Sequence, residues 1–167
     1  PEDATTPSGV LLKSVLLNGT RSSTTTPEVD AGWGRVWLDS NLYFAGDARQ
    51  LRIFDVPNAA GVSEGQTMTF PLTVSAGEPL RATLVWYDPA PSFVAPQALV
   101  NNLDLSLEAA GQTWLGNQLA GGESVTGGAI DVLNSVEQIL LPSPAAGDYT
   151  VRVTANGLTG NGESASL

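Results

Sequence analysis

The stretch Leu99–Leu107 (LVNNLDLSL) decides the fold that we expect for this chain. Residues two apart in a β-strand face the same side, so Leu103, Leu105 and Leu107 share one face of a predicted strand. The opposite face carries oxygen-bearing side chains, namely Asn102, Asp104 and Ser106. One side is therefore predicted to enter a hydrophobic core, and the other to present a short polar row.

The same alternation of apolar and polar residues continues on both sides of this strand. It predicts further strands at about residues 51–56, 67–74, 82–87, 113–115, 135–141 and 149–155. Turn-forming residues, many of them glycine, separate these segments at residues 76–79, 110–111, 121–122, 127–128 and 146–148. Many short strands joined by tight turns are typical of an antiparallel β-sandwich or jelly roll, so a mainly β fold is predicted.

Residues 9–17 (GVLLKSVLL) do not follow this period and predict a short α-helix, ending by about residue 18. Its apolar side chains lie at helical spacing, Ser8 is a suitable N-cap, and Asn18-Gly19 is a suitable end. A helix this short and apolar needs a large partner surface, which the segment itself does not supply.

Trp33 and Trp37 lie in a compact apolar segment that follows a Ser/Thr-rich loop. We interpret both side chains as buried anchors rather than as a ligand platform. Together with the change of period near residue 50, this segment divides the chain in two. The predicted parts are an N-terminal segment, residues 1–47, and a sandwich domain, residues 48–167.

The charge and composition of the 167-residue chain exclude several classes of function. With 17 acidic and 7 basic residues it carries a formal charge of −10, which disfavours binding to nucleic-acid phosphates. It contains neither histidine nor cysteine, so it has no Ser-His-Asp triad, no thiolate chemistry and no His-ligated metal of its own. No apolar run reaches the length of a membrane span, and we expect no membrane partner. We therefore predict that this chain alone is not an enzyme.

Calcium is the one cofactor that the residues suggest, because Ca²⁺ prefers several oxygen ligands from carboxylates, amides and carbonyls. Asp88 ends a predicted strand, and Asn102 and Asp104 share a strand face a little further along. These three residues are the predicted metal ligands. A second oxygen-rich group consists of Asp131, Asn134 and Glu137. The alternative is structural, with Asp88 capping a turn and the asparagines hydrogen-bonding loop backbone.

Three aromatic residues, Trp86, Tyr87 and Trp114, could stack against a sugar. Trp86 is in phase with the apolar face of its strand and is predicted to be core, whereas Tyr87 points the other way. Trp114 lies in a polar run and fits either interpretation. A carbohydrate-binding surface is therefore an alternative that these residues leave open.

Several segments, in this order, resemble the C-terminal part of subtilisin-like serine proteases of the peptidase S8 family. The first two are similar to the last helix of the catalytic domain and the segment after it, and the others to a C-terminal jelly-roll domain. They are LLKSVLLNG at 11–19, GWGRV at 32–36, LVWYDP at 84–89, LVNNLDLSL at 99–107, NSVE at 134–137 and GDYTV at 147–151.

The resemblance implies a C-terminal fragment of a secreted endopeptidase whose sandwich braces the catalytic part and aids substrate access. The family's catalytic Asp, His and Ser would lie upstream of Pro1, so no catalytic residue is assigned in this chain. The implied partners are the catalytic part of the same protease and protein substrates, with no residue assigned to ligand binding. Calcium binding by related sandwiches supports the calcium prediction. The alternative is an independent sandwich module that binds carbohydrate or protein.

Overall fold

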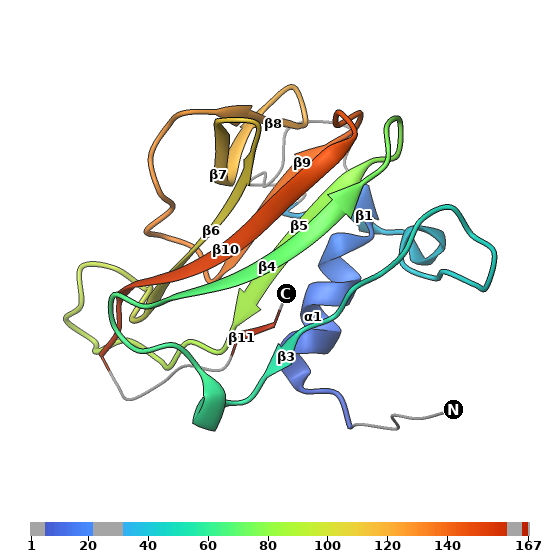
Figure 1. Ribbon diagram of the computed structural model, residues 1–167. Coiled ribbons are helices and arrows are strands. Elements are labelled where there is room, and N and C mark those ends of the chain that lie inside the picture. The colour runs from blue at the N-terminus through green and yellow to red at the C-terminus, as the bar shows by residue number, and fades with distance from the viewer. Residues whose placement is uncertain (1–5, 22–31, 160–164, 167) are drawn as a thin grey trace.

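The computed structural model describes residues 6–21, 32–159 and 165–166. It is mainly β, with one short α-helix near the N-terminus (Figure 1). The elements are α1 Gly9–Asn18, β1 Thr20–Arg21, β2 Arg35–Val36, the 3₁₀ turn η1 Leu38–Ser40, β3 Asp55–Val56, the 3₁₀ turn η2 Asn58–Ala60, β4 Thr67–Val74, β5 Leu80–Trp86, β6 Asn102–Ala109, β7 Gln112–Ala120, β8 Glu123–Thr126, β9 Val136–Leu141, β10 Gly147–Gly157 and β11 Ala165–Ser166.

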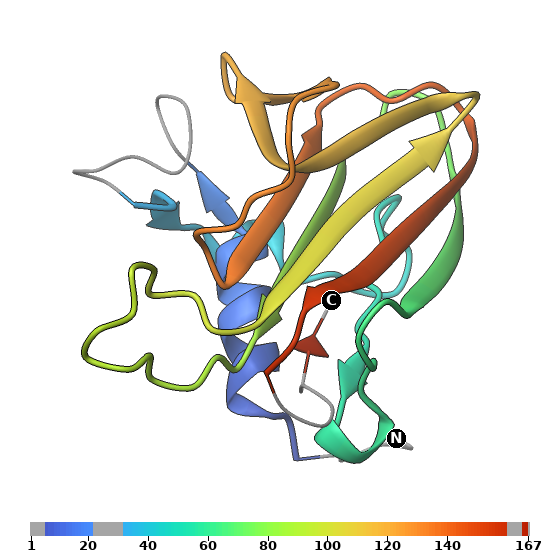
Figure 2. The ribbon, with the colours of Figure 1, turned by 90° about the vertical axis from the view of Figure 1, so that its left-hand side faces the viewer.

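Two antiparallel sheets form a sandwich, as predicted. One sheet has the order β4-β10-β6-β7-β8 and the other the order β3-β11-β5-β9 (Figures 1 and 2). The chain passes repeatedly from one sheet to the other, for example from β4 to β5 and from β5 to β6. Several strands therefore pair with strands far away in the sequence, such as β4 with β10 and β5 with β9, whereas β6, β7 and β8 follow one another.

The core lies between the two sheets. Leu103, Leu105 and Leu107 of β6 are fully buried and confirm the predicted apolar face. They pack in one cluster with Leu84 of β5 and Ile139 of β9, so both sheets contribute to a single core. Trp86 also belongs to this cluster, as predicted.

A tight hairpin connects β6 to β7 at the predicted turn. Ala110 and Gly111 both have positive φ angles, 48° and 76°, as a two-residue type I′ turn requires. The strand after this turn is longer than predicted, because β7 continues to Ala120. Residues 51–54 are the opposite case, since they alternate in sequence but do not form a strand.

Helix α1 lies along β5, on the outer face of the four-stranded sheet (Figure 1). Ser8 caps it through a 3.0 Å hydrogen bond from the Leu11 N–H, as predicted. At its other end, Gln138 Nε2 donates to the Leu17 carbonyl at 2.9 Å, and Thr83 Oγ1 pairs with Asn18 Oδ1 at 3.0 Å. The sheet itself thus supplies part of the partner surface that this apolar helix needs.

The interpretation of Trp37 as a buried anchor is wrong, whereas Trp33 is half-buried. Trp37 is 39% exposed, and the Arg21 guanidinium lies 4.6 Å from the centre of its ring. A cation stacked on the ring takes the place of the apolar neighbours that a buried tryptophan would have. Among the described residues, no helix is long and apolar enough to cross a membrane.

Candidate functional site

The site with the most unusual chemistry is a polar corner, where β7 leaves β6 and approaches β9. We use "polar corner" for Asp104, Gly116, Asn117, Asp131 and Glu137. The β6–β7 pairing ends at Ser106↔Leu115, and the β7–β8 register is interrupted between Trp114 and Leu119. Asn117, within this interruption, has a φ angle of 59°, a left-handed conformation that asparagine tolerates better than most residues. The bend leaves backbone groups of β6 and of β9 without a strand partner.

The Asn117 side chain satisfies the exposed edge of β9. Its Nδ2 donates to the Val136 carbonyl at 2.9 Å, and its Oδ1 accepts from the Gln138 N–H at 2.9 Å. A primary amide can make this pair because it carries the same donor and acceptor as a peptide group. Asn117 therefore acts as one residue of an additional strand beside β9.

On the other side of the polar corner, the Glu137 carboxyl group accepts a hydrogen bond from the backbone of β6. Its Oε2 accepts from the Leu105 N–H at 2.6 Å, and the residue is only 1% exposed. Gly116 makes room for it, because a Cβ at that position would overlap Oε2. The second oxygen, Oε1, is buried without a hydrogen-bond partner.

Burial raises the pKa of Glu137 to about 9. The Leu105 N–H opposes this change, while the nearby carboxylates of Asp104 and Asp131 add to it. Glu137 is therefore protonated at neutral pH. A carboxyl group held neutral can donate a proton in a catalytic site, but this group is sealed from solvent and its hydrogen-bond partner is a backbone amide.

Asp104 lies on the same side of β6 as Asn102, as the two-residue period predicts. Asn102 Nδ2 approaches both carboxylate oxygens of Asp104, at 3.2 and 3.3 Å, and Asn156 Nδ2 from β10 donates to Oδ2. Burial raises the pKa of Asp104, the two amide side chains oppose this, and Asp131 adds to it. Asn102 Oδ1 is buried without a partner.

Asp88 makes the kind of backbone contact that the structural alternative describes. Its two oxygens accept from the Val100 and Asn101 N–H groups at 2.9 and 2.8 Å. The Asn101 carbonyl accepts in turn from Trp86 Nε1 at 3.0 Å. Asp88 thus fixes the end of the long loop between β5 and β6.

The residues fit a calcium ion in part. Asn102 Oδ1 is an oxygen without a hydrogen-bond partner, and a hollow of about 390 Å³ lies beside Asn102 and Asn156. Within the described part of the chain, however, no three acidic side chains converge on one point. A cation at Asp104 would therefore need amide, carbonyl or water oxygens for most of its ligands.

Members of the second oxygen-rich group also interact, because Asp131 Oδ2 accepts from Asn117 Nδ2 at 2.5 Å and from Asn134 Nδ2 at 2.8 Å. Sequence reasoning missed Gly116 and Asn117. The available signal was a Gly-Asn pair inside a strand pattern, which is typical of a bulge.

The three aromatic residues considered for sugar stacking do not form a common surface. Trp86 is 2% exposed, and Trp114 is half-buried with its ring centre 6.4 Å from that of Tyr149. Tyr87 is the exposed member, at 66%. A stacking platform of several rings is therefore absent at these three positions.

Comparison with known proteins gives a loose link to proteases. No protein-family model matches the chain. Over 157 residues, 88% of the chain, it is 29% identical to the Serine protease/ABC transporter B family protein tagA of Dictyostelium discoideum. The matched region is 9% of that protein, so the chain spans less than a tenth of its length.

The role of the Asn117 side chain can be tested by replacing it with alanine. Asn117→Ala leaves the Val136 carbonyl and the Gln138 N–H unpaired and forces alanine into a positive φ, so we expect a loss of about 2–4 kcal/mol of unfolding free energy. Asn117→Gly removes the strain and isolates the hydrogen bonds. Urea unfolding measures both variants, and wild-type stability of Asn117→Gly would show that the side-chain bonds contribute nothing.

The pKa of Glu137 predicts a dependence of stability on pH. Because it is raised in the folded chain, the native state keeps a proton that the unfolded state releases above its ordinary pKa of 4.5. This contribution to stability is complete below pH 4.5 and is lost as the pH rises to about 9, by at most about 1.4 kcal/mol per pH unit. Urea unfolding from pH 5 to 9, with chelator present, should show this slope, and Glu137→Gln should flatten it. An equal slope in both proteins would rule out this assignment.

Proposed function

We propose that this chain is a C-terminal piece of a secreted subtilisin-like serine endopeptidase, and that its sandwich braces the catalytic part and aids access of protein substrates. The observation that carries the proposal is a set of exposed apolar side chains on α1 and in residues 36–44, two segments that the hydrogen bond from Asn41 Nδ2 to the Val15 carbonyl joins. The members of this set are Leu12, Leu16, Val36, Trp37, Leu38, Leu42 and Phe44, with Phe44 74% exposed. We call these seven residues the apolar face.

A helix that only covers a sheet would bury its apolar side chains against that sheet, whereas α1 leaves some of them exposed. Leu11 and Ser14 are the buried residues of α1. Leu12 and Leu16, one turn apart, are 54% and 44% exposed and so lie together on the helix surface. Large exposed apolar patches mark interaction sites. The catalytic part of the same protease is the partner that fits the sequence resemblance of residues 11–19 and 32–36.

Two further observations support this proposal. The chain has no histidine, so hydrolysis by a Ser-His-Asp triad would use residues outside it. The similarity to a protein named as a serine protease covers 88% of the chain. Bracing by packing needs no chemical group in the sandwich itself, in agreement with a Glu137 carboxyl group that is buried and bonded to a backbone amide.

The test uses the full-length protease with Leu12→Asp and Leu16→Asp combined. Two carboxylates in the proposed interface should separate the catalytic part from its brace, and we expect thermal inactivation to accelerate roughly tenfold. The matched control is Phe93→Asp with Val94→Asp, at 109% and 89% exposure on the β5–β6 loop. Residual activity on casein after heating measures both proteins.

Equal inactivation rates for the two double variants would contradict the bracing role. Retention of the isolated chain on chitin, cellulose or collagen, abolished by Tyr87→Ala, would instead support the independent binding module. Because Tyr87 lies outside the apolar face, the two experiments give separate answers.

We also propose that this piece of the protease holds a structural calcium ion, with ligands among Asp88, Asn102 and Asp104. Asn102 and Asp104 are the stronger pair, because both oxygens of Asp88 already accept backbone N–H groups. The cation would supply positive charge beside Asp104, whose pKa the nearby charge of Asp131 helps to raise. The unpaired Asn102 Oδ1 is a ready oxygen ligand.

Thermal unfolding with millimolar calcium and with chelator tests this proposal. An ion that binds the native state at a hundred times its dissociation constant adds about 2.7 kcal/mol, so we expect calcium to raise the midpoint by several degrees. Asp104→Asn should remove the response, and Asp39→Asn, on the exposed turn η1, should keep it. A midpoint that does not move with calcium would exclude the ion.

A further inference from the structure

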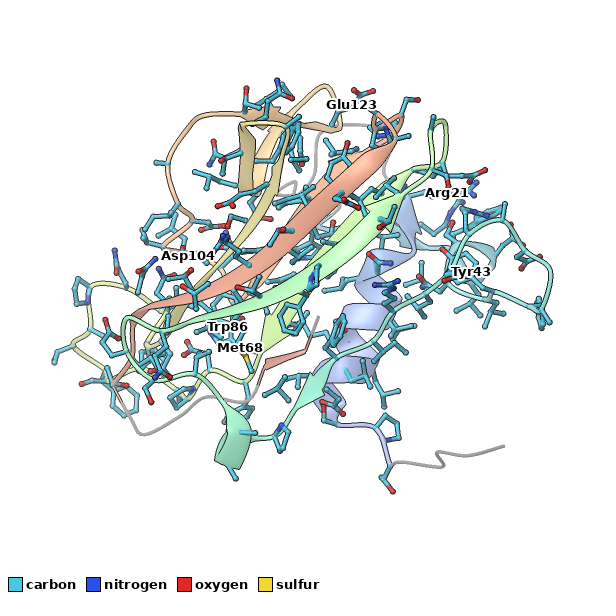
Figure 3. All side chains as sticks on the ribbon, viewed as in Figure 1. Arg21, Tyr43, Met68, Trp86, Asp104 and Glu123 are labelled. Carbon is cyan, nitrogen blue, oxygen red and sulfur yellow. The ribbon has the colours of Figure 1, made fainter. Side chains whose placement is uncertain are left out.

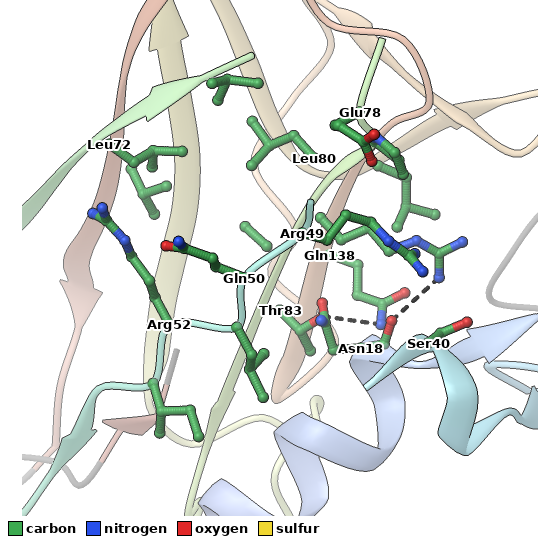
Figure 4. A pocket seen from close by; sticks show the side chains of 18 of the residues that line it. Asn18, Ser40, Arg49, Gln50, Arg52, Leu72, Glu78, Leu80, Thr83 and Gln138 are labelled. Carbon is green, nitrogen blue, oxygen red and sulfur yellow. Dashed lines mark hydrogen bonds between the residues drawn. The ribbon is translucent and has the colours of Figure 1, made fainter. Parts of the chain in front are cut away.

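A cavity of about 690 Å³ opens between the end of α1, residues 48–54, and strands β4 and β5 (Figure 4). Its volume is typical of pockets that bind small molecules. It is separate from the polar corner, since Arg21 and Tyr43 of its lining lie on the other side of the molecule from Asp104 (Figure 3). Nothing in the proposed bracing role uses this cavity.

Basic side chains are concentrated around this cavity, although the protein as a whole is acidic. Four of the chain's seven basic residues line it, namely Arg21, Arg49, Arg52 and Arg81. Glu78 is the acidic residue among its described lining. In the part of the chain that the structure describes, the one ion pair is Arg152–Glu108, between β10 and β6. None of the four arginines is therefore paired with a described carboxylate.

Backbone carbonyl groups position two of these guanidinium groups. Arg81 Nη1 donates to the Asn18 and Thr20 carbonyls, at 3.2 and 2.9 Å, just where α1 ends. Arg52 Nη1 donates to the Pro71 carbonyl of β4 at 3.3 Å. A guanidinium has five N–H donors, so both side chains are fixed in place with most donors still free.

Aromatic rings hold the other two. Arg21 lies over Trp37 and donates to Ser40 Oγ at 3.3 Å, while the Arg49 guanidinium lies 5.4 Å from the centre of the Tyr43 ring. A guanidinium stacked on a ring keeps its N–H groups, in the plane of the group, available for an anion.

The arginines also repel one another. The pKa of Arg81 is lowered, first by burial and then by the charges of Arg21 and Arg49, with Tyr43 acting in the opposite direction. A cluster of like charges that the protein does not neutralise is stabilised by a bound anion.

We propose that this cavity binds a ligand with two or more carboxylate groups. Arg49 and Arg52 lie on opposite sides of Gln50 (Figure 4), which suits separate carboxylates better than one compact phosphate. Each guanidinium can bind a carboxylate through two parallel hydrogen bonds. Apolar side chains that also line the cavity, such as Leu51 and Leu80, suit the carbon skeleton that joins the acids. An acidic peptide and a small polycarboxylic acid share this chemistry.

Isothermal titration calorimetry of the 167-residue chain tests the proposal with three probes. Citrate represents a free polycarboxylic acid, acetyl-Asp-Glu-Asp-Glu-amide represents an acidic peptide, and inorganic phosphate is the compact anion. We expect both carboxylate probes to bind more tightly than phosphate, and binding to weaken as NaCl rises from about 0.05 to 0.5 M. The tighter of the two identifies the source of the ligand.

Variants connect the binding to the cavity. Arg49→Gln with Arg52→Gln should weaken the carboxylate probes roughly tenfold or more, while Arg152→Gln, whose arginine pairs with Glu108, should not. Arg49→Lys, which keeps the charge but loses the planar fork, should lie between them, and urea midpoints establish that each variant is folded. No saturable binding at millimolar probe, an unchanged affinity in the double variant, or binding of phosphate alone would overturn the proposal.

Discussion

The structure depends on one buried hydrogen bond, from the Leu105 N–H to the carboxyl group of Glu137. Leu105 belongs to the centre of one sheet and Glu137 to the edge of the other, so the bond joins the sheets inside the core. Burying an ionised carboxylate would cost several kcal/mol, roughly what a domain of this size can spare. Holding Glu137 neutral avoids that cost. Where β7 bends away, this carboxyl group accepts the buried Leu105 N–H in place of a strand partner.

The outer face of the four-stranded sheet also carries buried polar side chains that hydrogen-bond to another element. Thr83 and Gln138 are buried polar residues whose partners are the end of α1 and each other. The end of the helix is therefore hydrogen-bonded to the four-stranded sheet. The exposed apolar side chains of α1 and the four arginines without an ion pair lie around this junction. The proposed contacts with the catalytic part and with a carboxylate ligand are both found there.

Local patterns were sufficient to predict β4, β6 and β10, because an alternation with a period of two residues indicates directly which side chains enter the core. The same rule placed Asn102 beside Asp104. It failed at residues 51–54, which alternate but border a cavity, and at Gly116-Asn117, where the alternation is broken by a bend. The roles of Asn117, Glu137 and Asp88 depend on backbone groups up to 32 residues away, and no local pattern contains that information.

The close approach of Gly116 to Glu137 also restricts how this chain can diverge. A Cβ at position 116 would overlap both Oε2 and Cβ of Glu137, so a side chain there requires Glu137 to move. Shortening Glu137 alone leaves the Leu105 N–H buried and unsatisfied. Neither substitution is neutral as a first step, although the two together with a compensating change in β7 could be. The corner is thus an example of epistasis, in which positions distant in sequence are inherited as a set.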